Sequence, residues 1–341
     1  QRLTSEALIP WMEEAITDLP EPSPDQQSWN FLDIGTSEGA NSINTMNHLI
    51  EFVRRKSELP VWALFDDLPT NDFNQMFLNL FPKSAPALSG TAVYSAAIGG
   101  SAFGRLVPPK TLHLATTYNA IGFYESKPSA TLPNFVIPMI PNPNAPREGV
   151  HVSPSELIPF QKQSYQDLYQ FYAARAQELV PGGKLLVQVY GKTETQSTGH
   201  GIMDVLSDAF LDFVEEDILP RSFYVNFIFP AYYRDLDELT APLQNESELS
   251  TAYRIEHTQA YDTRAPFDDF ASTGDRKTWA QSYTSFLRAF TEPVVAEALP
   301  DELIEKQLVD KIYQRIEHLL AENPERYEFH FISIAALLTR L

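Results

Sequence analysis

The stretch Phe31–Asn41, FLDIGTSEGAN, decides the fold of this 341-residue chain. Its first four residues predict a short buried strand that contains one charge, Asp33. The two glycines that follow, Gly35 and Gly39, permit a tight turn before a helix that begins near Asn41. A strand, a glycine turn and a helix N-terminus together form a site where backbone N–H groups and the helix dipole face a ligand.

The charged residue indicates which cofactor this turn suits. The dinucleotide fingerprint G-x-G-x-x-G requires glycine at the position of Asp33, which disfavours a nicotinamide dehydrogenase. The pattern D-x-G-x-x-x-G suits S-adenosylmethionine (SAM), whose ammonium group is a natural partner for a carboxylate at the end of a strand. An ordinary strand–helix turn with an incidental aspartate explains this stretch about as well, so the residues downstream decide.

Length and composition limit the class of protein. A chain of 341 residues, 43% of them hydrophobic, predicts a large α/β domain with an inserted or appended part. A net charge of −20 disfavours nucleic acid as a partner, because such binding depends on cationic side chains. Cys is absent, which excludes disulfides and thiolate metal sites, and no apolar run approaches the roughly 18 residues of a membrane span. We therefore expect a soluble cytoplasmic enzyme.

A second buried strand is predicted at 61–65, and it ends in the acidic pair Asp66 and Asp67. An acidic residue at the end of the second strand of a doubly wound sheet is well placed to bind two ribose hydroxyls. A solvated turn before the helix expected at 71–81 is the alternative. The position favours adenosine binding by one of these aspartates.

The chain then continues the alternation of strands and helices. Further strands are expected at 91–98, 112–116 and 184–191, and a helix is expected at 164–179. The glycine-rich loop before residue 112 can lie against a nucleotide base. Segment 136–149 contains four prolines and is expected to be an irregular excursion over the surface.

Past residue 191 the pattern becomes mainly helical and predicts a cap over the sheet. The expected elements are helices at 203–216, 277–299 and 302–320 and a closing apolar strand at 329–341. We divide the chain into four parts: an N-terminal helical segment that contributes to the substrate site (1–25), a SAM-binding α/β core (26–195), a mainly helical cap (196–300), and a C-terminal helix and strand that complete the core sheet (301–341).

The order of these motifs resembles the plant SABATH family, SAM-dependent enzymes that mostly methylate small carboxylic acids. FLDIGTSEGAN is similar to the family's first motif, and DDLPTNDFNQMF (66–77) to its signature N-D-L-P-x-N-D-F-N, the most specific single match. Three later segments match in the same order: GGSAFGRLVPPKTLHLATTY (99–118), ELVPGGKLLVQVYG (178–191) and RAFTEPVVAEAL (288–299). The resemblance covers almost the whole chain. It implies a doubly wound, mostly parallel seven-stranded sheet of the class I methyltransferase (Rossmann-like) type, a helical cap and a homodimer.

The resemblance also implies roles for individual residues of a cofactor site. Asp33, Gly35 and Asn41 would line the methionine part of SAM. Asp67 would hold the ribose, with Leu68 beside the adenine.

The resemblance gives further residues roles beside the adenine, near the methyl donor and at the substrate carboxylate. Ser101 and Ala102 match a pair that flanks the adenine, although the plant enzymes have Phe where this chain has Ala102. Tyr118 matches a tyrosine near the methyl donor. Gln1 and Arg2 resemble a Gln-Arg or Gln-Gln near the family's N-terminus, where the Gln helps to hold the substrate carboxylate.

One departure from the family concerns the substrate. The plant enzymes place a carboxylate-holding Trp four residues after that tyrosine, and this chain has Gly122 there, followed by Phe123. The pocket is therefore expected to be wider, which would admit a bulkier or doubly acidic substrate. Phe229 and Tyr232 fall in the segment that shapes the family's acyl pocket, and each fits a plain core aromatic equally well. Candidates to hold a second carboxylate are Arg147, Arg221 and Arg234.

The expected chemistry requires neither a general base nor a metal. A carboxylic acid with a pKa near 4 is ionised at pH 7, so its oxygen can attack the methyl group directly, leaving S-adenosylhomocysteine (SAH) as the other product. His113 lies in an apolar stretch and is interpreted as structural, and no histidines have metal-binding spacing. Methylation of a nitrogen or phenolic oxygen of a small secondary metabolite is the alternative enzyme. A SAM-binding interaction protein without catalysis is the alternative from another class.

Overall fold

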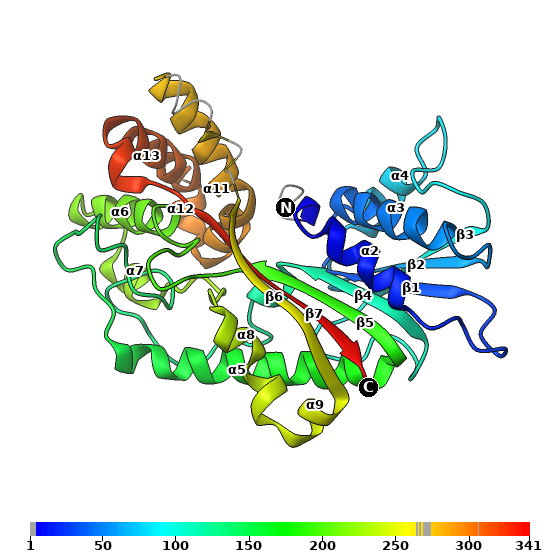
Figure 1. Ribbon diagram of the computed structural model, residues 1–341. Coiled ribbons are helices and arrows are strands. Elements are labelled where there is room, and N and C mark those ends of the chain that lie inside the picture. The colour runs from blue at the N-terminus through cyan, green and yellow to red at the C-terminus, as the bar shows by residue number, and fades with distance from the viewer. Residues whose placement is uncertain (1–4, 264, 266, 269–273, 306) are drawn as a thin grey trace.

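The computed structural model describes residues 5–341 except 264, 266, 269–273 and 306. Gln1 and Arg2, expected near the substrate, lie outside the described residues. The fold is organised around one seven-stranded sheet with the order β3-β2-β1-β4-β5-β7-β6 (Figure 1). Its strands are β1 (Trp29–Ile34), β2 (Val61–Asp67), β3 (Val93–Gly99), β4 (Leu112–Tyr118), β5 (Leu179–Tyr190), β6 (Tyr253–Thr263) and β7 (Phe331–Arg340).

The pairing of the strands confirms the doubly wound, mostly parallel sheet. Strands β1 to β5 run parallel to their neighbours, whereas β7 is antiparallel to β5 and β6 is antiparallel to β7. Because β1 pairs with β2 on one side and β4 on the other, the winding direction reverses at β1. Ligands of such sheets bind at this reversal, beyond the carboxyl ends of the strands.

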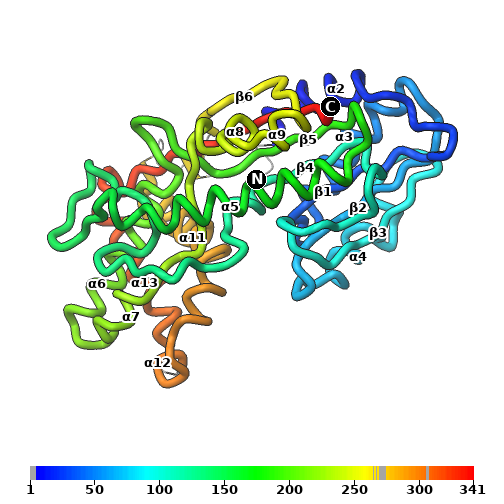
Figure 2. Tube along the Cα trace, turned by 90° about the horizontal axis from the view of Figure 1, so that it is seen from below, coloured from blue at the N-terminus to red at the C-terminus, as the bar shows by residue number. Residues whose placement is uncertain are grey.

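Two helical layers cover the sheet because its central strands are apolar on both faces. Phe31 of β1 belongs to the core under one layer, and Leu32 belongs to the core under the other. Figure 2 shows the long helix α5 running along the underside of the sheet. The first layer comprises α2 (Ile9–Asp18), α3 (Ala40–Arg54) and α4 (Phe73–Leu80), and the second comprises α5 (Pro154–Glu178), α8 (Leu236–Asn245) and α9 (Ser247–Ala252).

A helical cap with its own hydrophobic core lies beside the sheet, as the sequence predicted (Figure 1). Its last long helix packs against α6 and α11, so in the C-terminal part only β7 completes the sheet. The cap helices are α6 (Ile202–Glu215), α7 (Arg221–Asn226), α11 (Arg276–Ala298), α12 (Asp301–Glu305) and α13 (Leu308–Glu322), and short 3₁₀ helices lie at η1 (Ala120–Gly122) and η2 (Pro324–Tyr327).

Parts of the structure differ from the sequence prediction, among them an edge strand, the start of a helix and an irregular segment. Strand β6 was not expected, because its polar sequence YRIEHTQAYDT is that of an edge strand rather than a buried one. Helix α5 begins at Pro154 rather than at the predicted Ser164. A capping box formed by Ser153 and Glu156 marks this earlier start. Segment 136–149 is irregular, but its first residues, Val136 and Ile137, are buried in the core of the cap rather than lying on the surface.

Candidate cofactor and substrate site

A cavity of about 460 Å³ opens at the reversal of the sheet, between the carboxyl ends of the strands and the cap. It combines an acidic end, where β2 and the loop after β3 meet, with an aromatic end towards the cap. Its lining residues are Gly35, Ser37, Asp66, Asp67, Leu68, Gly100, Ser101, Ala102, Phe103, Tyr118, Asn119, Ala120, Phe123, Tyr124, Glu125, Tyr190 and Phe290.

The glycine turn after β1 forms one wall of the cavity. Gly35 has φ +80°, and a Cβ there would lie 2.3 Å from the Cβ of Ala120, so no other residue fits. Gly39, with φ +89°, directly precedes α3. The turn therefore brings backbone close to the cavity at the N-terminal end of a helix, as the sequence predicted.

Asp67 is held by the backbone at the end of β2. Its Oδ2 accepts a hydrogen bond from the N–H of Ser37 at 2.6 Å, and its Oδ1 accepts one from the N–H of Leu68 at 2.7 Å. A carboxylate has about four acceptor positions, so two bonds leave it able to accept two more. Since Asp67 lines the cavity, these free positions suit a pair of hydroxyl groups.

The neighbouring Asp66 also lines the cavity, a role that the sequence left open between the two aspartates. Its side chain is 1% exposed, and its Oδ1 is buried without a hydrogen-bond partner. Burial raises the pKa of Asp66 to about 8, although the nearby Arg175 opposes this shift. Burial therefore favours the neutral form of the Asp66 carboxyl group.

Asp33 and Asn41 do not line the cavity. Asp33 is buried behind the glycine turn, where it accepts hydrogen bonds from Thr116 Oγ1 at 2.5 Å and from Ser42. Burial raises the pKa of Asp33 to about 6, and the hydrogen bond from Ser42 is the main opposing contribution. Asn41 is the second residue of α3, one turn away from the cavity wall. Both lie next to the glycine turn rather than facing the open space.

The loop after β3 forms the opposite wall. Ser101 and Ala102 line the cavity, as predicted for a pair beside a base. Ser101 Oγ donates a hydrogen bond to Glu125 Oε2 at 2.6 Å, which joins this loop to the segment after β4. Leu68, which is 55% exposed at the end of β2, provides an apolar surface facing the same space.

Aromatic rings form the end of the cavity nearest the cap. Tyr118 and Phe123, both predicted, line it together with Tyr190 and Phe290, which the sequence analysis missed. Phe229 lies behind this wall, with its ring centre 6.1 Å from that of Phe123 and 6.0 Å from that of Phe290. Both missed residues had a signal: Tyr190 ends a core strand at the ligand-binding edge, and Phe290 lies in a segment that matches the family.

Gly122 does not widen the cavity, contrary to the prediction. It lies outside the lining, and a Cβ there would point to Val189 Cγ2 at 3.0 Å, into the core under the sheet. Tyr232 also lies outside this cavity. Its hydroxyl donates to Glu238 Oε1 at 2.6 Å, and it lines a separate cavity with Met139.

None of the three candidate arginines reaches the cavity, which excludes them as partners for a second carboxylate there. Arg147 pairs with Asp212 at 2.9 Å, and Arg221 stacks over Tyr224. Arg234 is fully buried behind the wall and donates to the Ile121 carbonyl at 2.6 Å. Among the described lining residues there is no Lys, Arg or His.

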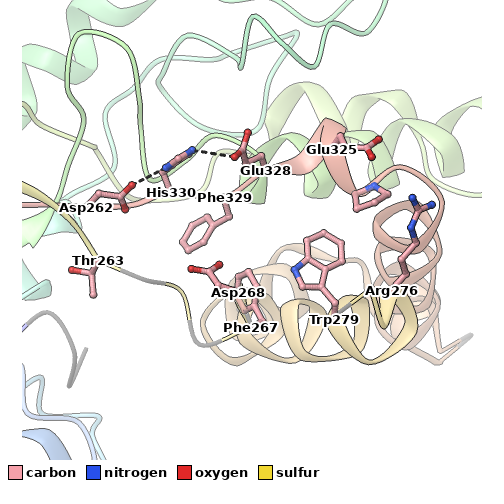
Figure 3. Close-up of a pocket in the computed structure, with 12 residues that line it drawn as sticks. Asp262, Thr263, Phe267, Asp268, Arg276, Trp279, Glu325, Glu328, Phe329 and His330 are labelled. Atoms are coloured by element: carbon pink, nitrogen blue, oxygen red, sulfur yellow. Dashed lines mark hydrogen bonds and ion pairs between the residues drawn. The ribbon is translucent and has the colours of Figure 1, made fainter. Parts of the chain in front are cut away.

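A larger cavity of about 740 Å³ lies between the end of β6, α11 and η2 (Figure 3). Four of its twelve lining residues are acidic, and His330 bridges Asp262 at 2.7 Å and Glu328 at 3.6 Å. It shares no described lining residue with the first cavity, and positions 264, 266 and 269–273, close in sequence to its lining residues, lie outside the described part of the chain. We assign it no ligand.

His113 is a buried structural residue, as interpreted from the sequence. Its Nδ1 accepts a hydrogen bond from the N–H of Asn30 at 3.1 Å, and burial lowers its pKa to about 4. Within the described part of the chain, no group of three or more His, Cys, Asp or Glu is placed to hold a metal ion. No helix among the described residues is long and apolar enough to cross a membrane.

Comparison with known proteins gives one family. The model of a family described as "SAM dependent carboxyl methyltransferase" matches residues 1–341. The chain is 25% identical over 323 residues to gibberellic acid methyltransferase 2 of Arabidopsis thaliana, which covers 88% of this chain and 79% of that protein. It is 22% identical over 357 residues to a 3,7-dimethylxanthine N-methyltransferase of Camellia sinensis, with 97% and 89% covered.

A solved structure has the same fold. The structure of a loganic acid methyltransferase with SAH superposes with a TM-score of 0.78 at 19% identity, over 99% of this chain and 93% of that one. The comparisons confirm the SABATH resemblance and the class I methyltransferase fold that the motifs predicted.

Proposed function

The chain belongs to the SAM-dependent carboxyl methyltransferase family, and we propose that its cavity holds SAM at the acidic end and a small carboxylic acid against the aromatic end. The observation that carries this proposal is the cavity at the sheet reversal, in which residues predicted for each part of SAM line one space. The product is the methyl ester of the acid.

The residues present fit SAM in three ways. Asp67 keeps two acceptor positions free at the point where a ribose diol is expected. The loop residues Ser101 and Ala102 line the same cavity as Leu68, and the apolar side chains of Ala102 and Leu68 suit a flat base. Gly35 leaves no side chain between the turn and the space where the methionine part would lie, with Asp33 and Asn41 close behind.

The chain's own residues position the reactants and exclude water. When bound, SAM supplies a methyl group that forms a bond to a carboxylate oxygen, while the broken carbon–sulfur bond leaves its electron pair on sulfur as SAH. No proton moves, so the protein needs no base. Tyr118 and the aromatic wall hold the acid against the methyl donor, and orientation alone contributes roughly 7–11 kcal/mol to lowering such a barrier.

The cavity favours an acid with one carboxylate and an apolar body. Phe123, Tyr190 and Phe290 offer aromatic surface, and the described lining has no cation for a second carboxylate. Gln1, which matches the family's substrate-holding position, is proposed as a carboxylate contact. Phe229 supports the wall from behind, and Tyr232 is proposed to shape the pocket indirectly through that layer.

The test is to incubate the enzyme with SAM and a panel of aromatic, aliphatic and dicarboxylic acids, and to detect methyl esters by mass spectrometry. Monocarboxylic acids with apolar bodies are expected to react and dicarboxylic acids to react poorly. Binding of SAH without turnover of any acid would instead indicate a non-catalytic SAM-binding protein.

Methylation of a nitrogen or phenolic oxygen is the second candidate. It is favoured by the lining itself, because Asp66, Asp67 and Glu125 are acidic and repel an anionic acceptor when ionised. The 3,7-dimethylxanthine N-methyltransferase is 22% identical to this chain, a value similar to the 25% of the gibberellic acid methyltransferase. Xanthines and phenols in the same panel distinguish the two reactions.

We further propose that the protein is a homodimer, as the family resemblance implies. We also propose that it is cytoplasmic, which agrees with the absence of Cys. The expected mass in solution is therefore twice the 38.5 kDa of one chain. Light scattering at micromolar concentration measures it, and a mass near 38.5 kDa contradicts the dimer. The four-part division of the chain also remains a proposal, with β6 assigned to the core sheet and α13 to the cap.

A further inference from the structure

A buried ion pair lies beneath the loop that lines the acidic end of the cavity. Arg175 and Glu178, near the end of α5, are both 0% exposed, and Arg175 Nε lies 2.6 Å from Glu178 Oε2. Neither residue lines the cavity, and neither was singled out by the sequence. Their remaining polar atoms therefore show what the pair does.

Those atoms bind the backbone of the loop after β3 at four places. Arg175 donates from Nη1 to the carbonyl of Ala102 at 3.0 Å and from Nη2 to the carbonyl of Gly104 at 2.6 Å. Glu178 Oε1 accepts from the N–H of Leu106 at 2.5 Å and from that of Val107 at 3.1 Å. The pair thus holds both halves of a loop that contains no helix or strand of its own.

The energetics indicate that this pair is specific rather than incidental. Burying two charges is costly unless they are paired and make further hydrogen bonds, and here every side-chain nitrogen and oxygen of the pair has a hydrogen-bond partner. The planar guanidinium of Arg spreads its donors over a rigid fork, which suits one carboxylate and two separate carbonyls better than the compact ammonium of Lys. The loop backbone is therefore fixed by groups on α5, a rigid helix, rather than by its own packing alone.

Resting on the proposed function, we propose that Arg175 and Glu178 are positioning residues that hold Ser101 and Ala102 at the distance from Leu68 required to clamp the adenine of SAM. They touch neither SAM nor the acid. Their contribution is to the affinity for the adenosine half of the cofactor, and the methyl-transfer step itself does not depend on them.

Two variants test this proposal. Arg175→Lys keeps the charge beside Glu178 but loses the fork that reaches Ala102 and Gly104. The double variant R175M/E178L removes both charges, so no unpaired charge is left buried if the single change prevents folding. The matched control is Arg340→Lys, because Arg340 also donates to a carbonyl at the end of α5, that of Ala176 at 2.7 Å, but not to the loop.

The expected result is a rise of about tenfold or more in the KM for SAM and in the Kd for SAH and for adenosine. The kcat at saturating SAM and the KM for the acid are expected to stay close to the wild-type values. In the control, thermal stability is expected to fall without a change in SAH affinity.

Two outcomes overturn the inference. Variants that melt at lower temperature but bind SAH and adenosine as wild type show that the pair only stabilises the fold. Equal rises in the KM values for SAM and for the acid show a general disturbance of the cavity. Failure of the wild-type protein to bind SAH contradicts the proposed function instead, so the two failures are distinguishable.

Discussion

Two neighbouring residues at the end of β2 have opposite environments because successive strand side chains point to opposite faces of a sheet. Asp67 faces the glycine turn, where the backbone N–H of Ser37 binds it. Asp66 faces the layer of α5, where burial raises its pKa and the charge of Arg175, which is paired with Glu178, opposes this shift only in part. One carboxyl group is thus prepared to accept hydrogen bonds, and the other is kept neutral.

Asp67→Asn is expected to weaken SAH binding by about 10- to 100-fold, because hydrogen bonds to a charged group contribute about 1.5–3 kcal/mol. Isothermal titration calorimetry measures the change. Asp72→Asn is the matched control, since Asp72 only caps α4 through the N–H of Gln75, and Asn is an equally good cap. Equal affinity of D67N and wild type contradicts ribose binding by Asp67.

The environment of Asp66 predicts a pH-dependent stability. Its folded-state pKa of about 8 exceeds the ordinary value of 3.8, so the native state binds this proton more tightly than the unfolded chain does. The free energy of unfolding therefore falls as the pH rises from about 4 to about 8, and this contribution is constant above that range.

Asp66→Asn keeps the size of the side chain and removes the titration. The Tm of D66N is expected to exceed that of wild type by a margin that grows between pH 5 and pH 8, reaching at least about 2 °C, and then stays level. Scanning fluorimetry across this range measures it. A margin that is the same at every pH shows that Asp66 does not titrate abnormally.

Individual residues of the site were predictable where a motif fixed both their identity and their strand end. Asp67, Leu68, Ser101 and Ala102 fall in this class and line one cavity. Side-chain direction was not predictable: Gly122 points into the core, so its place in a motif did not translate into a wider pocket. Arg175 was missed for the same reason, because nothing in a helical segment shows which loop its guanidinium reaches.

At the scale of elements, α11 connects the cap to the cavity. Its Phe290 lines the aromatic end, and Phe286, one turn earlier, packs against Phe290 as well as against Phe329 and Phe331. The helix therefore presents one aromatic ring to the proposed substrate and another to the core of the cap.

Phe290→Ala is expected to raise the KM for the acid about tenfold or more while leaving the KM for SAM unchanged, because a large aromatic contact is lost only at the substrate end. Steady-state kinetics with each substrate varied in turn measures both values. Phe210→Ala is the control, because Phe210 of α6 is buried against Phe223 and Phe227 and does not line the cavity. This variant is expected to lower stability without changing the KM for the acid. A change in the KM for SAM alone would place Phe290 at the cofactor instead.

Elements were predictable where hydrophobic periodicity was strong, as in the central strands and in α3. Strand β6 escaped because an edge strand pairs on one side only, and its exposed polar residues weaken the alternation. The start of α5 was readable from Ser153, Pro154 and Glu156, a capping box with proline at the first helical position. The capping residues therefore predict the start of this helix better than the spacing of its apolar residues does.

At the scale of the whole molecule, the net charge affects the order in which the cofactor and the acid bind. The chain carries −20, and the described cavity lining holds the carboxylates of Asp67 and Glu125, the neutral carboxyl group of Asp66 and no basic side chain. Such a field favours a cationic sulfonium cofactor and opposes an anionic acid, so the acid gains from binding after SAM has neutralised the site. Ordered binding, with SAM first, follows from this balance.

The pH dependence of turnover separates the two candidate reactions. With SAM at saturation, kcat is expected to stay flat from about pH 6.5 to pH 9, because an acid with a pKa near 4 is fully ionised throughout and no base takes part. The ionisation of Asp66 near pH 8 belongs to the protein without cofactor and is therefore expected in the KM for SAM rather than in kcat. A kcat that rises through an apparent pKa of 7 or above would indicate an acceptor that loses a proton. A nitrogen or hydroxyl group, rather than a carboxylate, would then be the site of methylation.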